Sequence, residues 1–201
     1  MKRKTFSLLA AGLLSALLAP LPAMAQAYPN KPVKVIIPFP PGGTLDAIGR
    51  QLAQKLSEQL GQSFVVENKP GGNGIIGADA VAKAQADGYT LLFNASTFTT
   101  APMTMKQVPY AVAKDFAPVA LVAKAPLSVA INKNLPVTDI KSLIAYAKAK
   151  GGRATFAVGS VGSAGHLGTE LLKKNGMDYT VVPYKGTAPA FQDLIGGQID
   201  G

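Results

Sequence analysis

Short apolar runs alternate with segments of helical periodicity along most of this chain, and this alternation restricts its possible folds more than any other feature. Residues 33–37 form the first apolar run, after which leucine and isoleucine recur every three or four residues from position 45 to position 60. Strand-like runs that alternate with helical segments are typical of βα units and a largely parallel sheet. We therefore expect an α/β fold.

The same alternation continues to the last residues. We expect strands at 33–37, 64–66, 89–93, 116–122, 127–131, 155–158 and 180–182, and helices at 44–60, 75–84, 139–148, from about 166, and at 188–195. Residues 94–110 are expected to form a loop. A proline-rich stretch at 118–136 predicts a boundary between a first lobe over 26–126 and a second over 127–201. Because the pattern stops as a new apolar segment begins at Ile199, we expect a fragment with a truncated second lobe.

Residues 1–25 have the order of a secretory signal peptide. Three basic residues at 2–4 precede an apolar run over 6–19, and an A-x-A cleavage pattern follows at 23–25. The run is too short to span a bilayer comfortably, which argues against a retained membrane anchor. Without cysteine, no lipid can be attached at the cleavage point. We predict cleavage before Gln26 and export through the Sec route as a soluble protein.

Composition excludes several classes of site. The absence of cysteine rules out disulfides, thiolate metal sites and a cysteine nucleophile, and one histidine argues against a histidine-built zinc site. The formal charge is +9, but three of the basic residues lie in the leader and the others are scattered singly. This is weak evidence for a polyanion. We expect no metal, no cofactor and no nucleic-acid partner.

Two glycine-rich loops are candidate ligand sites. The first, P-F-P-P-G-G-T-L-D at 38–46, joins the first strand to the first helix. Its glycines allow close backbone approach, and the unpaired N–H groups of the helix start are anion donors. Alternatively, Thr44 only caps the helix and Asp46 only favours its positive end. Both interpretations can hold together.

The second candidate is the loop at 159–166, whose sequence is G-S-V-G-S-A-G-H. It repeats the logic of the first loop, although His166 with Ser163 or Ser160 also suggests an exported serine hydrolase. Such a histidine more often holds neighbouring backbone. Neither loop contains Lys or Arg, so a carboxylate there would be held by N–H groups, hydroxyls and water.

A literal G-x-G-x-x-G lies at 72–77 and raises a third interpretation, an NAD-type oxidoreductase. A dinucleotide site needs this motif directly after a strand, with an acidic residue about twenty positions later. Here residues 67–70 intervene, and no acid lies between Asp87 and Asp115. We therefore favour a close-packed turn in which small residues let a helix approach a strand.

Five segments together, in this order after a signal peptide, closely resemble the Bug family, the extracytoplasmic solute receptors of tripartite tricarboxylate transporters. They are P-F-P-P-G-G-x-x-D at 38–46, V-E-N-K-P-G at 66–71, D-G-Y-T-L-L at 87–92, D-F-A-P-V at 115–119 and V-P-Y-K-G at 182–186. The resemblance implies a periplasmic-binding-protein (Venus-flytrap) fold. Its two α/β lobes would close on a di- or tricarboxylate, an aromatic acid or an amino acid.

The resemblance also implies a set of binding residues and a role. The ligand-binding positions would be Phe39, Gly42, Gly43, Thr44, Asp46, Asn94, Ser96, Ser160, Gly162, Ser163 and His166. The chain departs from the family pattern in having Leu45 where a hydroxyl residue is usual, and in a second-lobe loop about two residues shorter. The expected protein is a monomeric periplasmic receptor without enzymatic activity, whose partners are a small carboxylate and the membrane components of the transporter.

Overall fold

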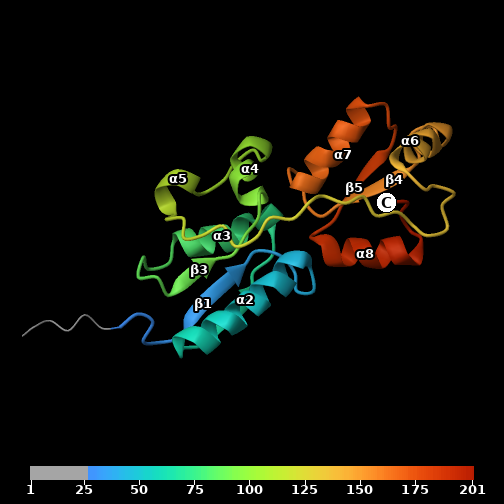
Figure 1. Cartoon of the computed structure of the whole chain (residues 1–201). Helices are drawn as coiled ribbons and strands as arrows, with labels where there is room; N and C mark the ends of the chain where they lie inside the picture. The colour runs from blue at the N-terminus through green and yellow to red at the C-terminus, as the bar shows by residue number, and fades with distance from the viewer. Residues whose placement is uncertain (1–26) are drawn as a thin grey trace, which may run out of the picture. The chain divides into compact units, whose positions relative to one another are not determined.

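The computed structural model describes residues 27–201, so the predicted signal peptide lies outside the described residues. Residues 31–201 form one compact unit. Within the described range, no helix combines the length and the apolar character needed to cross a membrane. The elements in chain order are β1 (Val33–Ile37), α2 (Thr44–Leu60), β2 (Phe64–Asn68), a 3-10 turn (Gly72–Gly74), α3 (Ile75–Ala82), β3 (Thr90–Leu92), α4 (Thr97–Thr104), α5 (Val112–Asp115), α6 (Ile140–Ala149), β4 (Thr155–Val158), α7 (Ala164–Lys174), β5 (Thr180–Pro183) and α8 (Thr187–Gly196) (Figure 1).

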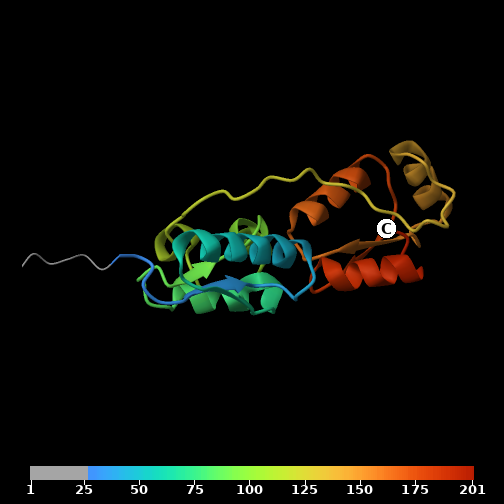
Figure 2. The same ribbon diagram turned by 60° about the horizontal axis from the view of Figure 1, so that its bottom comes forward.

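The first sheet is parallel and has the strand order β2-β1-β3. Val33 and Val35 of β1 pack with Ala53 of α2, while the intervening strand positions point to the opposite face. Figure 1 and Figure 2 show α2 along one face of this sheet and α3 along the other. A central parallel strand covered on both faces is largely apolar, which explains why four of the five residues at 33–37 are apolar, with the exposed Lys34 as the exception.

The second sheet consists of the parallel pair β4 and β5. Its core is built from Leu143, Ala147, Ala154, Phe156, Met177 and Tyr179. The chain end lies beside β4, because the Ala157 N–H donates to the Gly201 carbonyl (2.7 Å) and the Asp200 N–H to the Thr155 carbonyl (3.1 Å). The apolar segment that begins at Ile199 therefore runs along the edge of this sheet.

The structure confirms five of the predicted strands and all the predicted helices within a few residues, but two strands are wrong. Residues 116–131 contain no strand or helix. Val119 is 85% exposed and Leu121 is 74% exposed, and no described strand lies beside them to complete a ladder. The expected loop at 94–110 contains α4, which the pattern missed because T-F-T-T-A-P-M-T lacks helical periodicity and includes Pro102.

The G-x-G-x-x-G segment is a close-packed turn, as predicted. A Cβ on Gly77 would lie 2.7 Å from Pro38 Cβ and 2.9 Å from the Lys69 carbonyl oxygen. Pro38 directly follows β1 and Lys69 directly follows β2, so Gly77 lets α3 approach both strand ends. Position 77 therefore requires glycine, because any side chain would collide with the backbone of Pro38 and Lys69.

Replacing Gly77 tests this packing. Gly77→Ala should lower the free energy of unfolding by about 1–3 kcal/mol, because the contacted backbone must move to admit a methyl group. Gly165→Ala is the matched control, since a Cβ there meets only Ser163 Oγ at 3.8 Å and alanine favours a helix by up to about 1 kcal/mol. Urea unfolding followed by circular dichroism measures both, and a Gly77→Ala midpoint equal to wild type would contradict the packing argument.

Candidate functional site

The loops that follow β1, β3, β4 and β5 line one cavity of about 990 Å³, called here the large cavity. Ligands of open α/β sheets bind at the carboxyl ends of strands, where each loop runs into the next helix. The extended segment 120–130 also contributes to the lining, apart from Lys124. Strand ends from both sheets therefore contribute to the same cavity.

Four helices begin at the large cavity. The residues that precede their first turns all line it, and these are Gly43 before α2, Ser96 before α4, Ser163 before α7 and Gly186 before α8. The first N–H groups of a helix have no intrahelical partner, and the helix dipole makes that end partly positive. Convergent helix starts of this kind favour an anion.

The lining of the large cavity is almost uncharged. Among the described residues that form it, Asp46 is the one ionisable side chain, and no Lys or Arg takes part. Aromatic and aliphatic side chains supply most of the remaining wall, including Phe39, Phe156 and Phe191. A small ligand with an anionic group and an apolar body fits such a lining.

Asp46 anchors the loop after β1 from within. Its side chain is buried, and its carboxylate accepts hydrogen bonds from the Gly42 N–H (3.0 Å), Arg50 Nε (3.0 Å) and Asn68 Nδ2 (2.8 Å). The hydrogen bond from Arg50 is the main reason why the pKa of Asp46 falls to about 2. These contacts favour the structural interpretation of Asp46, because its oxygens are engaged and its charge is balanced.

His166 holds the backbone of its own loop. Its Nδ1 accepts a hydrogen bond from the Gly162 N–H (3.0 Å), and its backbone N–H donates to Ser163 Oγ (3.1 Å), which caps α7. The other ring nitrogen lies 3.9 Å from Glu170 Oε1. The described contacts include no hydrogen bond between this imidazole and a serine hydroxyl, so the hydrolase interpretation finds no support.

The structure brings most of the predicted site residues together. Those that line the large cavity are Phe39, Gly43, Thr44, Asp46, Asn94, Ser96, Ser160 and Ser163. Gly42, Gly162 and His166 are not part of the lining and instead shape the two loops through hydrogen bonds.

Sequence reasoning missed Thr187 as a lining residue. It begins α8, and a Cβ on Gly43 would lie 3.2 Å from its Oγ1, so the starts of α2 and α8 lie against each other in the wall of the large cavity. The signal was the position of Gly186-Thr187 between a strand and a helix, the same context that identified the other two loops.

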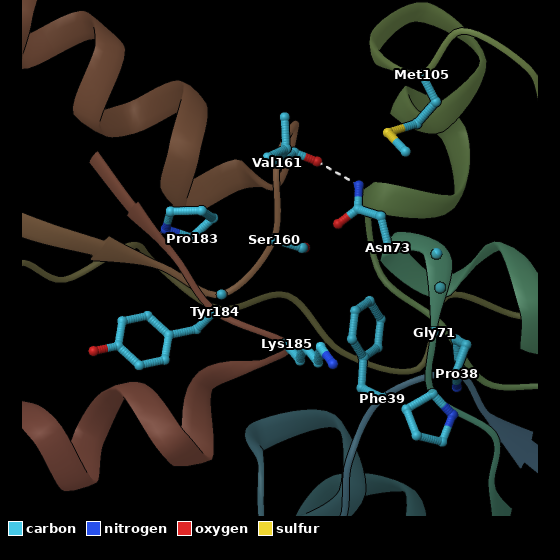
Figure 3. Close-up of a pocket in the computed structure, with 14 residues that line it drawn as sticks. Pro38, Phe39, Gly71, Asn73, Met105, Ser160, Val161, Pro183, Tyr184 and Lys185 are labelled. Atoms are coloured by element: carbon cyan, nitrogen blue, oxygen red, sulfur yellow. Dashed lines mark hydrogen bonds between the residues drawn. The ribbon is translucent and has the colours of Figure 1, made fainter. Parts of the chain in front are cut away.

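A second, smaller cavity of about 430 Å³ shares Phe39, Gly159 and Ser160 with the first. It is also lined by the loop after β2, with Asn73, and by Lys185 (Figure 3). The loop after β2 therefore opens on this small cavity, while the other four loops border the large one.

A family model and a related protein sequence both match most of this chain. The model of the tripartite tricarboxylate transporter family receptor matches residues 48–201. Protein BugT from Bordetella pertussis is 43% identical over 184 residues, which cover 89% of this chain and 56% of that protein. The chain therefore spans little more than half the length of this relative.

Solved structures show the same fold. The structure of R. palustris Rpa4515 with adipate is 40% identical, with a TM-score of 0.84, and the match covers 87% of this chain and 59% of that one. MatC (Rpa3494) from Rhodopseudomonas palustris with bound malate is 32% identical, with a TM-score of 0.75, over 86% of this chain and 60% of the other. The structure of periplasmic binding protein BugD is 40% identical, with a TM-score of 0.80, over 86% of this chain and 58% of the other. The fold is thus the α/β fold of periplasmic binding proteins, as the sequence predicted.

The contacts of Asp46 predict a dependence of stability on pH. Because the folded pKa of about 2 lies below the ordinary 3.8, Asp46 stabilises the fold above about pH 4, and this contribution is lost as the pH falls toward 2. We expect Asp46→Asn to lower the free energy of unfolding at neutral pH by about 1–2 kcal/mol, allowing for solvent screening at half-exposed Arg50.

Urea unfolding of both proteins at a series of pH values measures this contribution. The difference between wild type and Asp46→Asn should be constant from neutral pH to about pH 5 and should shrink below about pH 4. A difference that does not vary with pH would contradict the assignment.

Proposed function

The chain belongs to the tripartite tricarboxylate transporter receptor family, and on this premise we propose that it captures a small carboxylate in the large cavity and delivers it to a membrane transporter. The observation that carries the proposal is the convergence of four helix starts on an almost uncharged cavity. Adipate and malate, named with two of the related structures, are both small dicarboxylates.

The geometry favours recognition by neutral donors. With no Lys or Arg in the lining, a carboxylate would accept hydrogen bonds from N–H groups at the helix starts and from hydroxyls such as those of Thr44, Ser163 and Thr187. Balanced by Arg50, the Asp46 carboxylate would repel the anion little. The hydrocarbon part of the ligand would pack against the apolar wall that includes Phe39.

The residues would divide into two roles. Phe39, Gly43, Thr44, Asn94, Ser96, Ser160 and Ser163 would contact the ligand, since they line the large cavity. Gly42, Asp46, Gly162 and His166 would hold the two loops in place. The role of the protein would be binding without chemistry, because His166 uses Nδ1 to hold backbone and does not activate a serine.

The two sheets suggest how the receptor would operate. Each sheet would form the centre of one lobe, 26–126 and 127–201, and the segment 116–131 would connect them and act as the hinge. Ligand contacts that need loops from both sheets would favour the closed arrangement. The signal peptide predicted at residues 1–25 would place this receptor in the periplasm.

A panel of carboxylates tests the proposal. Native mass spectrometry of the purified chain would identify a co-purified acid, and calorimetric titration would rank dicarboxylates, tricarboxylates, aromatic acids and amino acids. We expect at least one small carboxylate to bind. Failure of every carboxylate to bind would overturn the proposal.

The variant Gly43→Ala tests where in the large cavity the carboxylate binds. Its φ of −82° suits any residue, so the fold should tolerate alanine, but the new Cβ would lie 3.2 Å from Thr187 Oγ1, between two helix starts. We expect a loss of affinity of about tenfold or more, because an anion could no longer approach the N–H groups of α2. Thermal unfolding serves as the control for folding, and unchanged affinity would contradict this location of the site.

A further inference from the structure

The loop after β2 reaches the loop after β4 through one side chain. Asn73, in the middle of the G-x-G-x-x-G segment, has a φ of 60° and donates a hydrogen bond from Nδ2 to the Val161 carbonyl (2.5 Å). Figure 3 shows Asn73 directed at this carbonyl, on the border of the small cavity. Asparagine adopts the left-handed conformation more readily than most residues, so the turn aims its amide at the opposite loop.

A second side chain makes an equivalent contact from α4. The Thr100 hydroxyl donates to the Gly162 carbonyl (2.8 Å), the residue next to Val161. The N–H of Gly162 is at the same time bonded to His166 Nδ1 (3.0 Å). The N–H of Gly162 is thus bonded to His166 of the same loop, and its carbonyl is bonded to Thr100 of α4.

The close approach at Gly162 is specific to glycine. A Cβ there would lie 2.8 Å from both Cγ2 and Oγ1 of Thr104, one helical turn after Thr100, and the φ of +76° disfavours other residues. The face of α4 that bears these two threonines therefore packs directly on the loop backbone. The carbonyls of Val161 and Gly162 are therefore bonded at the same place, one by Asn73 of the turn at 72–74 and the other by Thr100 of α4.

We propose that Asn73 and Thr100 are positioning residues that form a latch on the 159–163 loop and thereby set the affinity for the ligand. Neither side chain lines the large cavity, whereas Ser160 and Ser163 of the same loop do. The latch acts by fixing these serines in advance, which reduces the ordering cost of binding. Its effect on affinity rests on the proposed function, while its effect on the loop does not.

Variants that remove one hydrogen bond but keep the shape of the side chain or the backbone conformation separate the effect of the latch from the effect of packing. Thr100→Val removes the hydroxyl at constant shape, and Thr100→Ser keeps it. Asn73→Gly removes the amide, and glycine suits the left-handed backbone. We expect Thr100→Val and Asn73→Gly each to weaken binding of the best acid from the panel by about two- to tenfold, as for one hydrogen bond, and Thr100→Ser to bind like wild type.

Hydrogen–deuterium exchange without ligand gives an independent readout. Peptides covering 159–166 should exchange faster in Thr100→Val and Asn73→Gly than in wild type or Thr100→Ser, while the β1 peptide, used as an internal standard for global folding, stays protected. Unchanged exchange in 159–166 in both variants would overturn the latch, even where wild type binds a carboxylate. If wild type binds none, the proposed function fails, and the exchange comparison still decides whether the loop is latched.

Discussion

The convergence of four helix starts on one cavity is the feature on which the rest of the site depends. Parallel strands bring their carboxyl ends to one edge of a sheet, so the helices that follow begin at that edge. Two such sheets contribute α2 and α4 from one side and α7 and α8 from the other. Backbone donors would suit the proposed function, because they can bind an anion without the desolvation of a buried cation.

The two glycine-rich loops satisfy several of their own polar groups internally. Asp46 takes up the Gly42 N–H and the amide of Asn68, and Arg50 balances its charge. On the other loop, His166 performs the corresponding task, because its Nδ1 accepts the hydrogen bond from the Gly162 N–H. Buried polar groups that are fully paired make a loop rigid. Asp46 and His166 therefore both organise loop backbone, and N–H and hydroxyl groups would remain as donors for the proposed anion.

Sequence patterns predicted the sheets well because each strand has its partner and cover within the described residues. They failed at 116–131, where apolar residues such as Leu121 satisfy the strand pattern but have no neighbouring strand. Pattern also cannot show which strand-to-helix loops meet in space, so Thr187 was missed although its local context was visible. In contrast, the loops at 38–46 and 159–166 could be singled out from the sequence, because glycine after a strand has local consequences for backbone approach, and both loops line the large cavity.

The G-x-G-x-x-G segment shows why a motif needs its context. Its last glycine, Gly77, packs against the ends of β1 and β2. Asn73, which lies between the first two glycines, donates a hydrogen bond to the Val161 carbonyl of another loop. A nucleotide site would use these glycines to expose N–H groups to a pyrophosphate, whereas here one side chain from this turn makes a contact between loops. Each such hydrogen bond contributes only about 0.5–1.5 kcal/mol. Two such contacts can therefore favour one conformation of the 159–163 loop, although each contributes little to the stability of the whole fold.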